Sequence, residues 1–307
     1  MVRAVERRAG IIVALVAAAS AAVLVTVVAL GGGDDSDDSP PARSASVPAR
    51  VDRCDSGRAW AELRRQVELG PRQAGSRKLR RLAERLRRAL PGGRFERVPG
   101  HPRLRNVVGR IPGAAPAIVI AAHHDSKRLP GFVGANDGAA GTAAVVELAR
   151  ALRGVDRPAG APELRFVLFD GEEATDDSRP FRATGLRGST AYAERHADEI
   201  GALILLDFIA AKDLSIMREA SSDRALWARL REAADAVGAG AAFPPGRGTA
   251  ITDDHTPFLE RGVPSIDLIQ WPYACWHMRC DDLSAVSERS LDLSGEAVLE
   301  LVRRLGR

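Results

Sequence analysis

The chain has 307 residues, of which 45% are apolar and 27% charged, so it contains enough apolar material for a sizeable core. This composition excludes a collagen-like, mucin-like or wholly disordered chain, and the length suits one large α/β domain with additional segments. Lys and Arg total 44 against 40 Asp and Glu, which leaves a net charge of only +4. The positive charge is spread along the chain apart from one helical-looking stretch, residues 77–88, and we therefore expect no nucleic-acid partner.

The amino-terminal part of the chain is expected to lie outside the folded domain. Residues 10–30 carry no charge and would span roughly 30 Å as a helix, the thickness of a bilayer core. Basic residues in segment 1–9 precede this run and aspartates follow it, which predicts a cytoplasmic basic segment, a single-pass membrane anchor and an extracytoplasmic domain. A cleaved signal peptide is the alternative, and the domain would then be secreted. Residues 31–51 are rich in Gly, Asp, Ser and Pro and predict a disordered linker, so the catalytic domain is expected over 52–307.

From residue 52 onward, helical and strand patterns alternate. Apolar periodicity predicts helices over 59–67, 76–90, 142–152, 189–196, 226–236 and 290–305, and apolar runs predict strands over 106–111, 117–122, 164–169, 202–206 and 265–269. Strands separated by helices indicate a largely parallel sheet with helices on both faces.

Acidic and imidazole side chains follow these predicted strands at the point where each strand ends. The residues concerned are His123, Glu172, Glu173, Asp207 and His277, joined by Asp137 from a glycine-rich loop. Ligands of open α/β sheets bind outside the carboxyl ends of the strands, so we expect these groups to lie close together. Carboxylates in one cleft repel one another unless a cation is present, and imidazole with carboxylate suits zinc. Asp137, Glu173 and His277 would make a three-ligand catalytic set.

The adjacent pair Glu172-Glu173 can divide two roles, because neighbouring side chains point in different directions. One glutamate can bind the metal while the other acts as a general acid/base toward the substrate. Each feature alone has a simpler explanation, since a Glu-Glu pair is usually a solvated surface and a lone Asp after a strand is usually a helix cap. The joint pattern is what favours a metal site.

At these residues the sequence resembles the zinc-dependent glutaminyl-peptide cyclotransferases (glutaminyl cyclases) and, more distantly, the zinc aminopeptidases that share their fold. The matching stretches are residues 122–127, 132–137, 169–174, 205–212, 253–259, 261–264 and 276–277. The resemblance implies a three-layer α/β/α fold with a mixed, mostly parallel central sheet.

The resemblance also implies roles for individual residues. Asp137, Glu173 and His277 would hold zinc, and Glu172 would shuttle the proton. Asp207 and Asp253 would be acid partners hydrogen-bonded with that glutamate. Trp276 would form an aromatic wall beside the substrate, and Tyr273 would replace a pocket phenylalanine. His123 and Asp207 would lie at a second zinc site like that of the aminopeptidases. In those relatives Asp137 would bridge the two metals.

Two features favour a cyclase over a peptidase: the long insert between Glu173 and Leu186, and the doubled Asp253-Asp254 before His255. Departures affect the substrate pocket, since residues 175–178 stand where cyclases place a tryptophan and Asp267 replaces a histidine. We expect conversion of an amino-terminal glutamine to pyroglutamate, with peptide or protein amino termini as substrates. A zinc aminopeptidase with one or two zinc ions is the first alternative, and a membrane-tethered, non-catalytic binding module the second. Nothing in the sequence predicts an oligomer.

Cys275 and Cys280 flank His277. In an exported domain they are expected to form a disulfide that stiffens the loop of this ligand. Two unpaired thiols, or a metal site made by both cysteines and the histidine, are the alternatives.

Overall fold

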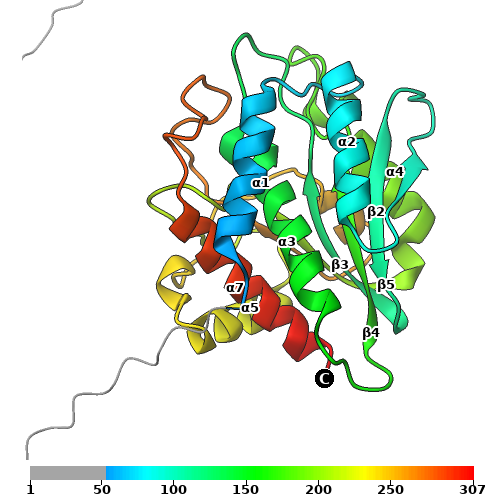
Figure 1. Ribbon diagram of the computed structural model, residues 1–307, viewed down its shortest axis with the longest axis vertical. Coiled ribbons are helices and arrows are strands. Elements are labelled where there is room, and N and C mark those ends of the chain that lie inside the picture. The colour runs from blue at the N-terminus through cyan, green and yellow to red at the C-terminus, as the bar shows by residue number, and fades with distance from the viewer. Residues whose placement is uncertain (1–52) are drawn as a thin grey trace, which may run out of the picture. The chain divides into compact units, whose positions relative to one another are not determined.

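The computed structural model describes residues 53–307, in which helices and strands alternate as the sequence predicts (Figure 1). The helices are α1 (Ser56–Leu69), α2 (Arg77–Ala89), α3 (Gly141–Arg153), α4 (Arg187–His196), α5 (Arg224–Ala236), α6 (Thr256–Leu259) and α7 (Glu288–Leu305), with short helical turns η1 (Ala135–Ala140), η2 (Phe181–Ala183), η3 (Ala197–Glu199) and η4 (Gly240–Ala242). The strands are β1 (Arg94–Arg97), β2 (Arg105–Ile111), β3 (Ala114–His123), β4 (Pro162–Phe169), β5 (Ile200–Leu206) and β6 (Ser265–Leu268).

The anchor expected over residues 10–30 and the linker expected over 31–51 lie outside the described residues. Within 53–307, no helix combines the length and the apolar character needed to cross a membrane.

The six strands form one mixed sheet in the order β1-β2-β4-β3-β5-β6. The three pairs β4-β3, β3-β5 and β5-β6 are parallel, whereas β1-β2 and β2-β4 are antiparallel. The mixed α/β fold is therefore confirmed. Strand β1 was not predicted, because its sequence Arg-Phe-Glu-Arg contains one apolar residue and lies at the half-exposed edge of the sheet.

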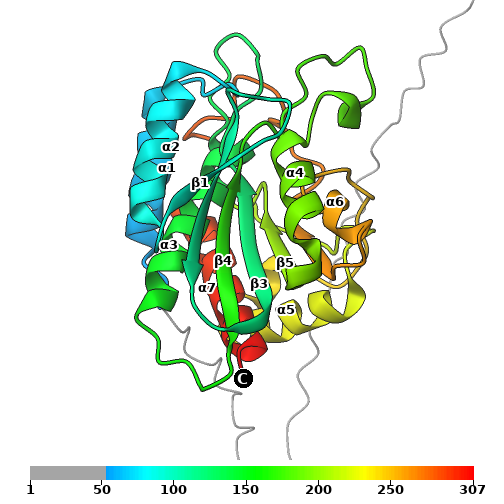
Figure 2. The ribbon, with the colours of Figure 1, turned by 90° about the vertical axis from the view of Figure 1, so that its right-hand side faces the viewer.

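The two faces of the sheet are covered by different helices. Successive side chains of a strand point to opposite faces, so a buried strand needs a helical layer on each face. On β3, Ile118 and Ile120 face the core formed with α1, α2, α3, α5 and α7, whereas Val119 and Ala121 face the core formed with α4 and α6. Figure 2 shows the two helical layers on opposite sides of the strands.

Helices α1 and α2 begin where polar side chains accept hydrogen bonds from amides of the first turn. Asp55 accepts a hydrogen bond from the amide of Arg58 at the start of α1, and Ser76 accepts one from Leu79 at the start of α2. In α2 the buried residues Leu79, Leu82, Ala83 and Leu86 repeat at helical spacing, and arginines occupy much of the remaining surface.

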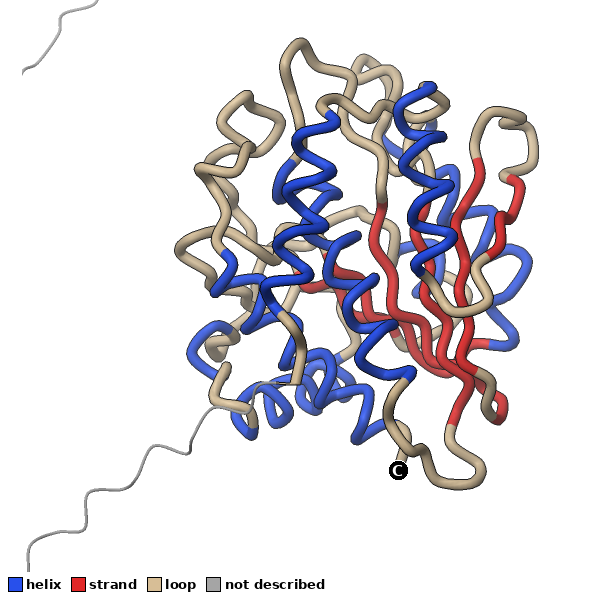
Figure 3. The backbone as a smooth tube through the Cα atoms, viewed as in Figure 1, coloured by secondary structure: helices blue, strands red, loops and turns tan. Residues whose placement is uncertain are grey.

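The parallel strands β3, β4 and β5 deliver the loops that follow them to one edge of the sheet (Figure 3). These loops carry the acidic and imidazole groups that the sequence places after each strand.

Candidate metal centre and catalytic site

Asp137 lies in η1, a tight turn between β3 and α3. The buried carboxylate of Asp281 accepts hydrogen bonds from the amides of Asn136 (2.8 Å) and Asp137 (3.1 Å) and so fixes this turn from the loop before α7. Gly138 has φ of 89°, and a Cβ atom there would lie 2.7 Å from the carbonyl oxygen of Asp125. A glycine is therefore required to present the Asp137 carboxylate at the edge of the sheet.

The loop after β4 presents Glu172 and Glu173 and is held by groups from neighbouring segments. The carboxylate of Asp125, just beyond β3, accepts hydrogen bonds from the amides of Gly171 (3.0 Å), Glu172 (3.2 Å) and Glu173 (3.3 Å). On the other side, the guanidinium of Arg187 donates to the carbonyl oxygen of Glu173 at 2.7 Å. Asp125 is thus a supporting residue whose position after a strand was visible in the sequence, although its partners were not.

His277 comes from the loop between β6 and α7. Cys275 and Cys280 form a disulfide around it, which confirms that prediction. The histidine has φ of 53°, an uncommon conformation for a residue with a Cβ atom, and the closed loop helps to hold it. Its ring stacks on Trp276 with centroids 4.4 Å apart.

The three residues predicted as zinc ligands converge. His277 Nε2 lies 3.6 Å from Asp137 Oδ2 and 3.5 Å from Glu173 Oε2. Tetrahedral ligands about 2.0–2.1 Å from zinc lie about 3.4 Å from one another, so these separations suit one zinc ion. Asp137 Oδ2 and Glu173 Oε1 are also buried without a hydrogen-bond partner in the described chain, as expected of atoms placed to bind a cation. The donor set therefore fits zinc.

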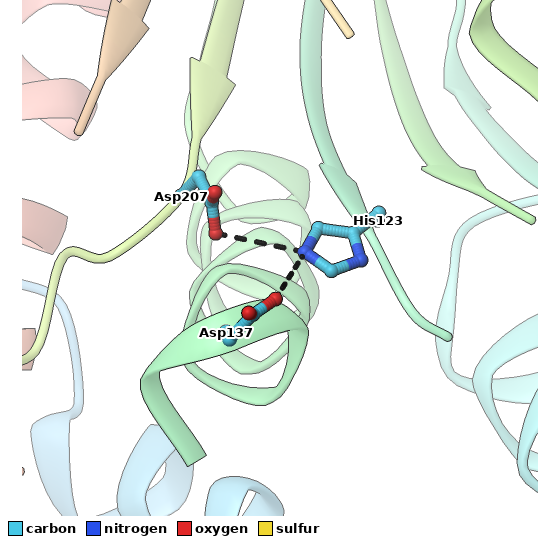
Figure 4. Close-up of side chains that lie close together, drawn as sticks. All are labelled: His123, Asp137 and Asp207. Carbon is cyan, nitrogen blue, oxygen red and sulfur yellow. Dashed lines mark ion pairs between the residues drawn. The ribbon is translucent and has the colours of Figure 1, made fainter. Parts of the chain in front are cut away.

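A second group of possible ligands shares Asp137 with the first. His123 Nε2 lies 3.2 Å from Asp137 Oδ1 and 3.6 Å from Asp207 Oδ1 (Figure 4). Burial disfavours the charged imidazole, but the carboxylates of Asp125, Asp137 and Asp207 close to its ring nitrogens outweigh burial and raise the pKa of His123. The arrangement has the shared carboxylate that the resemblance to aminopeptidases implies.

Glu172 is buried between the two groups, with Oε2 3.9 Å from His123 Nδ1. Burial, together with the negative charges of Glu173 and Asp253, raises its pKa well above the ordinary value. Asp207 and Asp253 line the same cavity, but the hydrogen bonds expected from them to Glu172 are not formed anywhere in residues 53–307. Instead, the negative charge of Asp253 acts on Glu172 by helping to raise its pKa.

A cavity of about 530 Å³ opens over this cluster. Polar and apolar side chains both line it: Glu172, Glu173, Asp207, Asp253 and His277 among the first, and Phe208, Ile251, Ile269, Trp271 and Trp276 among the second. Trp276 lines this cavity, and 44% of its surface is exposed.

Tyr273 is not among the residues that line this cavity. Its side chain is 9% exposed, and its hydroxyl donates a hydrogen bond to Asp281 at 2.8 Å. The substrate contact expected of Tyr273 stays a prediction, and in the structure the tyrosine supports the turn that presents Asp137. Trp271, which lies 5.0 Å from Trp276 between ring centroids, was missed and contributes to the wall. The signal available for it was an aromatic residue in the same loop as Trp276.

An α/β sheet with histidine and carboxylate side chains gathered beyond its strands defines an α/β protein with a candidate metal site. The chain belongs to peptidase family M28, whose family model matches residues 106–302. It is 28% identical to glutaminyl-peptide cyclotransferase of Drosophila melanogaster over 64% of this chain and 63% of that protein.

Solved structures are similar over nearly their whole length. A glutaminyl cyclase from an Acidobacteriales bacterium has a TM-score of 0.73 and 28% identity over 87% of this chain and 99% of the other. A glutaminyl cyclase of Porphyromonas gingivalis has a TM-score of 0.73 and 25% identity over 83% and 99% of the two chains. The resemblance to glutaminyl cyclases is thereby confirmed. The chain spans less than two thirds of the length of the first curated relatives that it matches.

Proposed function

We propose that the protein converts the amino-terminal glutamine of peptides or proteins into pyroglutamate with release of ammonia. The observation that carries this proposal is the division between two adjacent glutamates. Glu173 faces Asp137 and His277 as part of the candidate ligand group, and Glu172 lines the cavity beside that group without belonging to it. The similarity to glutaminyl cyclases over most of the domain supports the same reaction.

In the proposed reaction, the α-amine nitrogen bonds to the γ-carbonyl carbon of the same glutamine, and the bond from that carbon to the amide nitrogen breaks. Asp137, Glu173 and His277 would hold zinc, whose Lewis acidity at the γ-carbonyl would stabilise the developing negative charge. Glu172 takes the proton that the attacking amine loses and returns it to the nitrogen that leaves as ammonia. Its raised pKa makes it a stronger base than an exposed carboxylate, which suits a group that must accept a proton and then return it.

The apolar wall of the cavity has a function in the same reaction. Phe208, Ile269 and Trp271 line the same cavity as the carboxylates. A folded glutamine side chain placed against them is shielded from water, which favours attack by its own amine over hydrolysis of the amide.

A second candidate function is supported by the second ligand group. If His123, Asp137 and Asp207 hold a second zinc ion, Glu172 would instead deprotonate a water molecule for peptide hydrolysis, as in a two-zinc aminopeptidase. The experiment that separates the two functions uses the purified full-length chain, with its zinc content measured. A glutamine-peptide cyclisation assay and a leucine-anilide hydrolysis assay are run in parallel. We expect one zinc per chain with ammonia release from the first substrate; two zincs with hydrolysis of the second would establish the aminopeptidase. Absence of zinc and of both activities would favour a binding module.

We also propose that the domain is exported and held at the membrane by residues 10–30. The disulfide between Cys275 and Cys280 supports an oxidising compartment. Protease added to intact cells should remove the domain, and protection from that protease would contradict this localisation.

A further inference from the structure

One wall of the cavity has little secondary structure of its own. Ala250, Ile251 and Thr252 line the cavity between α5 and α6 in a segment without helix or strand. In the described chain, Ile251 is the only one of these three residues whose backbone makes a hydrogen bond, and its amide donates to Glu219 Oε1 at 3.0 Å. Glu219 therefore accepts the one backbone hydrogen bond of residues 250–252, while the Ile251 side chain packs against the apolar cluster that contains Phe208 and Ile269.

Glu219 is a buried anion with many donors around it. Only 2% of its surface is exposed, and its carboxylate accepts hydrogen bonds from the amides of Ser221 (2.9 Å) and Ser222 (2.7 Å) and from both serine hydroxyls (2.9 Å each). Burial opposes its ionisation, but hydrogen bonding to His255 and to the amides of Ser221 and Ile251 outweighs burial and holds its pKa well below the ordinary range.

Besides the amide of Ile251, Glu219 contacts His255, which follows residues 250–253 in the chain. His255 is fully buried at the start of α6; its Nε2 lies 3.3 Å from Glu219 Oε2, and its Nδ1 lies 3.7 Å from Asp267 Oδ2 on β6. The imidazole of His255 thus lies between the carboxylates of Glu219 and Asp267, which come from two different segments. Ile251 and His255 bracket Asp253, whose side chain lines the cavity.

From these contacts we propose that Glu219 is a positioning residue, which holds the wall at residues 250–253 in the shape that binds substrate. The inference rests on the proposed cyclase function for its kinetic consequence, but the placement of the wall does not depend on that function. Glu219 does not line the cavity and is not among the candidate metal ligands.

Glu296 on α7 offers a matched control for a buried glutamate. It is fully buried and also accepts hydrogen bonds from backbone amides, those of Arg53 and Cys54, but it does not line the cavity. Glu219→Gln and Glu296→Gln each replace one accepting oxygen by an NH2 group and should lower the melting temperature to a similar degree.

The test compares these two variants in full-length, zinc-loaded protein by kinetics and by amide hydrogen exchange. For Glu219→Gln we expect a KM for a glutamine peptide at least tenfold higher, a kcat changed less than threefold, and exchange in peptides covering 247–253 at least tenfold faster. Glu296→Gln should leave KM and this exchange unchanged. Wild-type KM and wild-type exchange in Glu219→Gln would overturn the proposal.

One additional variant and one independent measurement cover the cases in which Glu219→Gln does not fold or the protein lacks cyclase activity. Glu219→Asp retains the charge but is one methylene too short to reach Ile251, so it should reproduce the faster exchange in a protein that folds even if Glu219→Gln does not. If the wild-type protein has no cyclase activity, the proposed function fails, whereas exchange in segment 247–253 still decides whether Glu219 positions the wall.

Discussion

Glu172 and Glu173 are neighbours in the chain, yet their carboxylates lie in different environments. Glu173 faces a candidate metal position with His277, and burial with the nearby Asp137 raises its pKa to about 7. Glu172 lines the cavity, and its pKa is raised chiefly by burial. Asp125 fixes both through their amides, so their separation is a property of the backbone and should survive changes in either side chain.

The first prediction concerns this pair. Glu172→Gln should lower kcat by about 10²–10⁴-fold, the usual contribution of a general acid/base, and should leave zinc affinity unchanged. The adjacent Glu173→Gln is the matched control and should lose zinc. Metal content by atomic spectroscopy and ammonia release measure the two effects. Persistent turnover in zinc-loaded Glu172→Gln would show that another group carries the proton.

At the scale of elements, the loop that carries His277 contains both a disulfide and a residue with a positive φ. The disulfide between Cys275 and Cys280 closes it, and the histidine within it has a positive φ. An open loop relaxes to other backbone conformations, so the Cys275→Ser/Cys280→Ser double variant should bind zinc about 10–100-fold more weakly, as loss of other ligand-orienting groups does. Competition with a chromogenic chelator measures this. Wild type treated with a reductant is the control and should weaken equally; unchanged affinity in both would mean that packing of Trp276 against the histidine is sufficient.

The edge strand β1 is attached to α4 through one carboxylate. Glu96 Oε2 lies 3.0 Å from His196 Nε2, and Glu96 Oε1 lies 2.7 Å from Arg94 Nη2. Burial opposes ionisation of Glu96, but the hydrogen bonds and charges of these two partners outweigh it and lower its pKa to about 2.

A pH dependence of stability follows from that lowered pKa. A carboxyl group whose pKa is lower in the folded state stabilises the fold above its unfolded pKa of about 4.3 and loses this contribution as the pH falls toward 2. The difference in melting temperature between wild type and Glu96→Gln should therefore shrink between pH 5 and pH 2.5. Glu68→Gln, which removes an exposed carboxylate paired with Arg64, should show no such trend. A wild-type-to-Glu96→Gln difference that is constant with pH would contradict the assignment.

The sequence was informative where a residue's role depends on local pattern. Continuous apolar runs predicted β3, β4 and β5, and the residues that follow these strands predicted where the candidate ligands gather. The antiparallel pairing of β1 and β2 was not predictable, because a four-residue edge strand has no apolar periodicity of its own. Asp281 and Glu219 were missed for a related reason. Their partners are backbone amides of distant segments, 136–137 and 251, and amides leave no signature in a sequence.

For the whole molecule, the site concentrates negative charge at one edge of the sheet. Asp137, Glu172, Glu173, Asp207 and Asp253 are all buried there. His123 and His277 are the imidazoles that face this group, and Lys127 Nζ, 3.7 Å from Glu173 Oε2, is shared with Asp177. A divalent cation would offset the repulsion among these buried carboxylates, which otherwise destabilises the folded state. Metal binding and folding should therefore be coupled.

The last prediction tests that coupling. A ligand that binds only the folded state at 100 times its Kd stabilises it by about 2.7 kcal/mol, and for a domain of this size each kcal/mol corresponds to about 2–4 °C. Removing zinc with a chelator should lower the melting temperature by roughly 5–10 °C, and adding zinc at 100 times its Kd should restore it. His277→Ala is the control, because without this ligand the melting temperature should no longer respond to zinc. A response in which one equivalent restores half of the loss and a second equivalent the rest would indicate that His123, Asp137 and Asp207 also bind zinc. An identical melting temperature with and without the metal would mean that protons, taken up by the buried carboxylates, balance the charge instead.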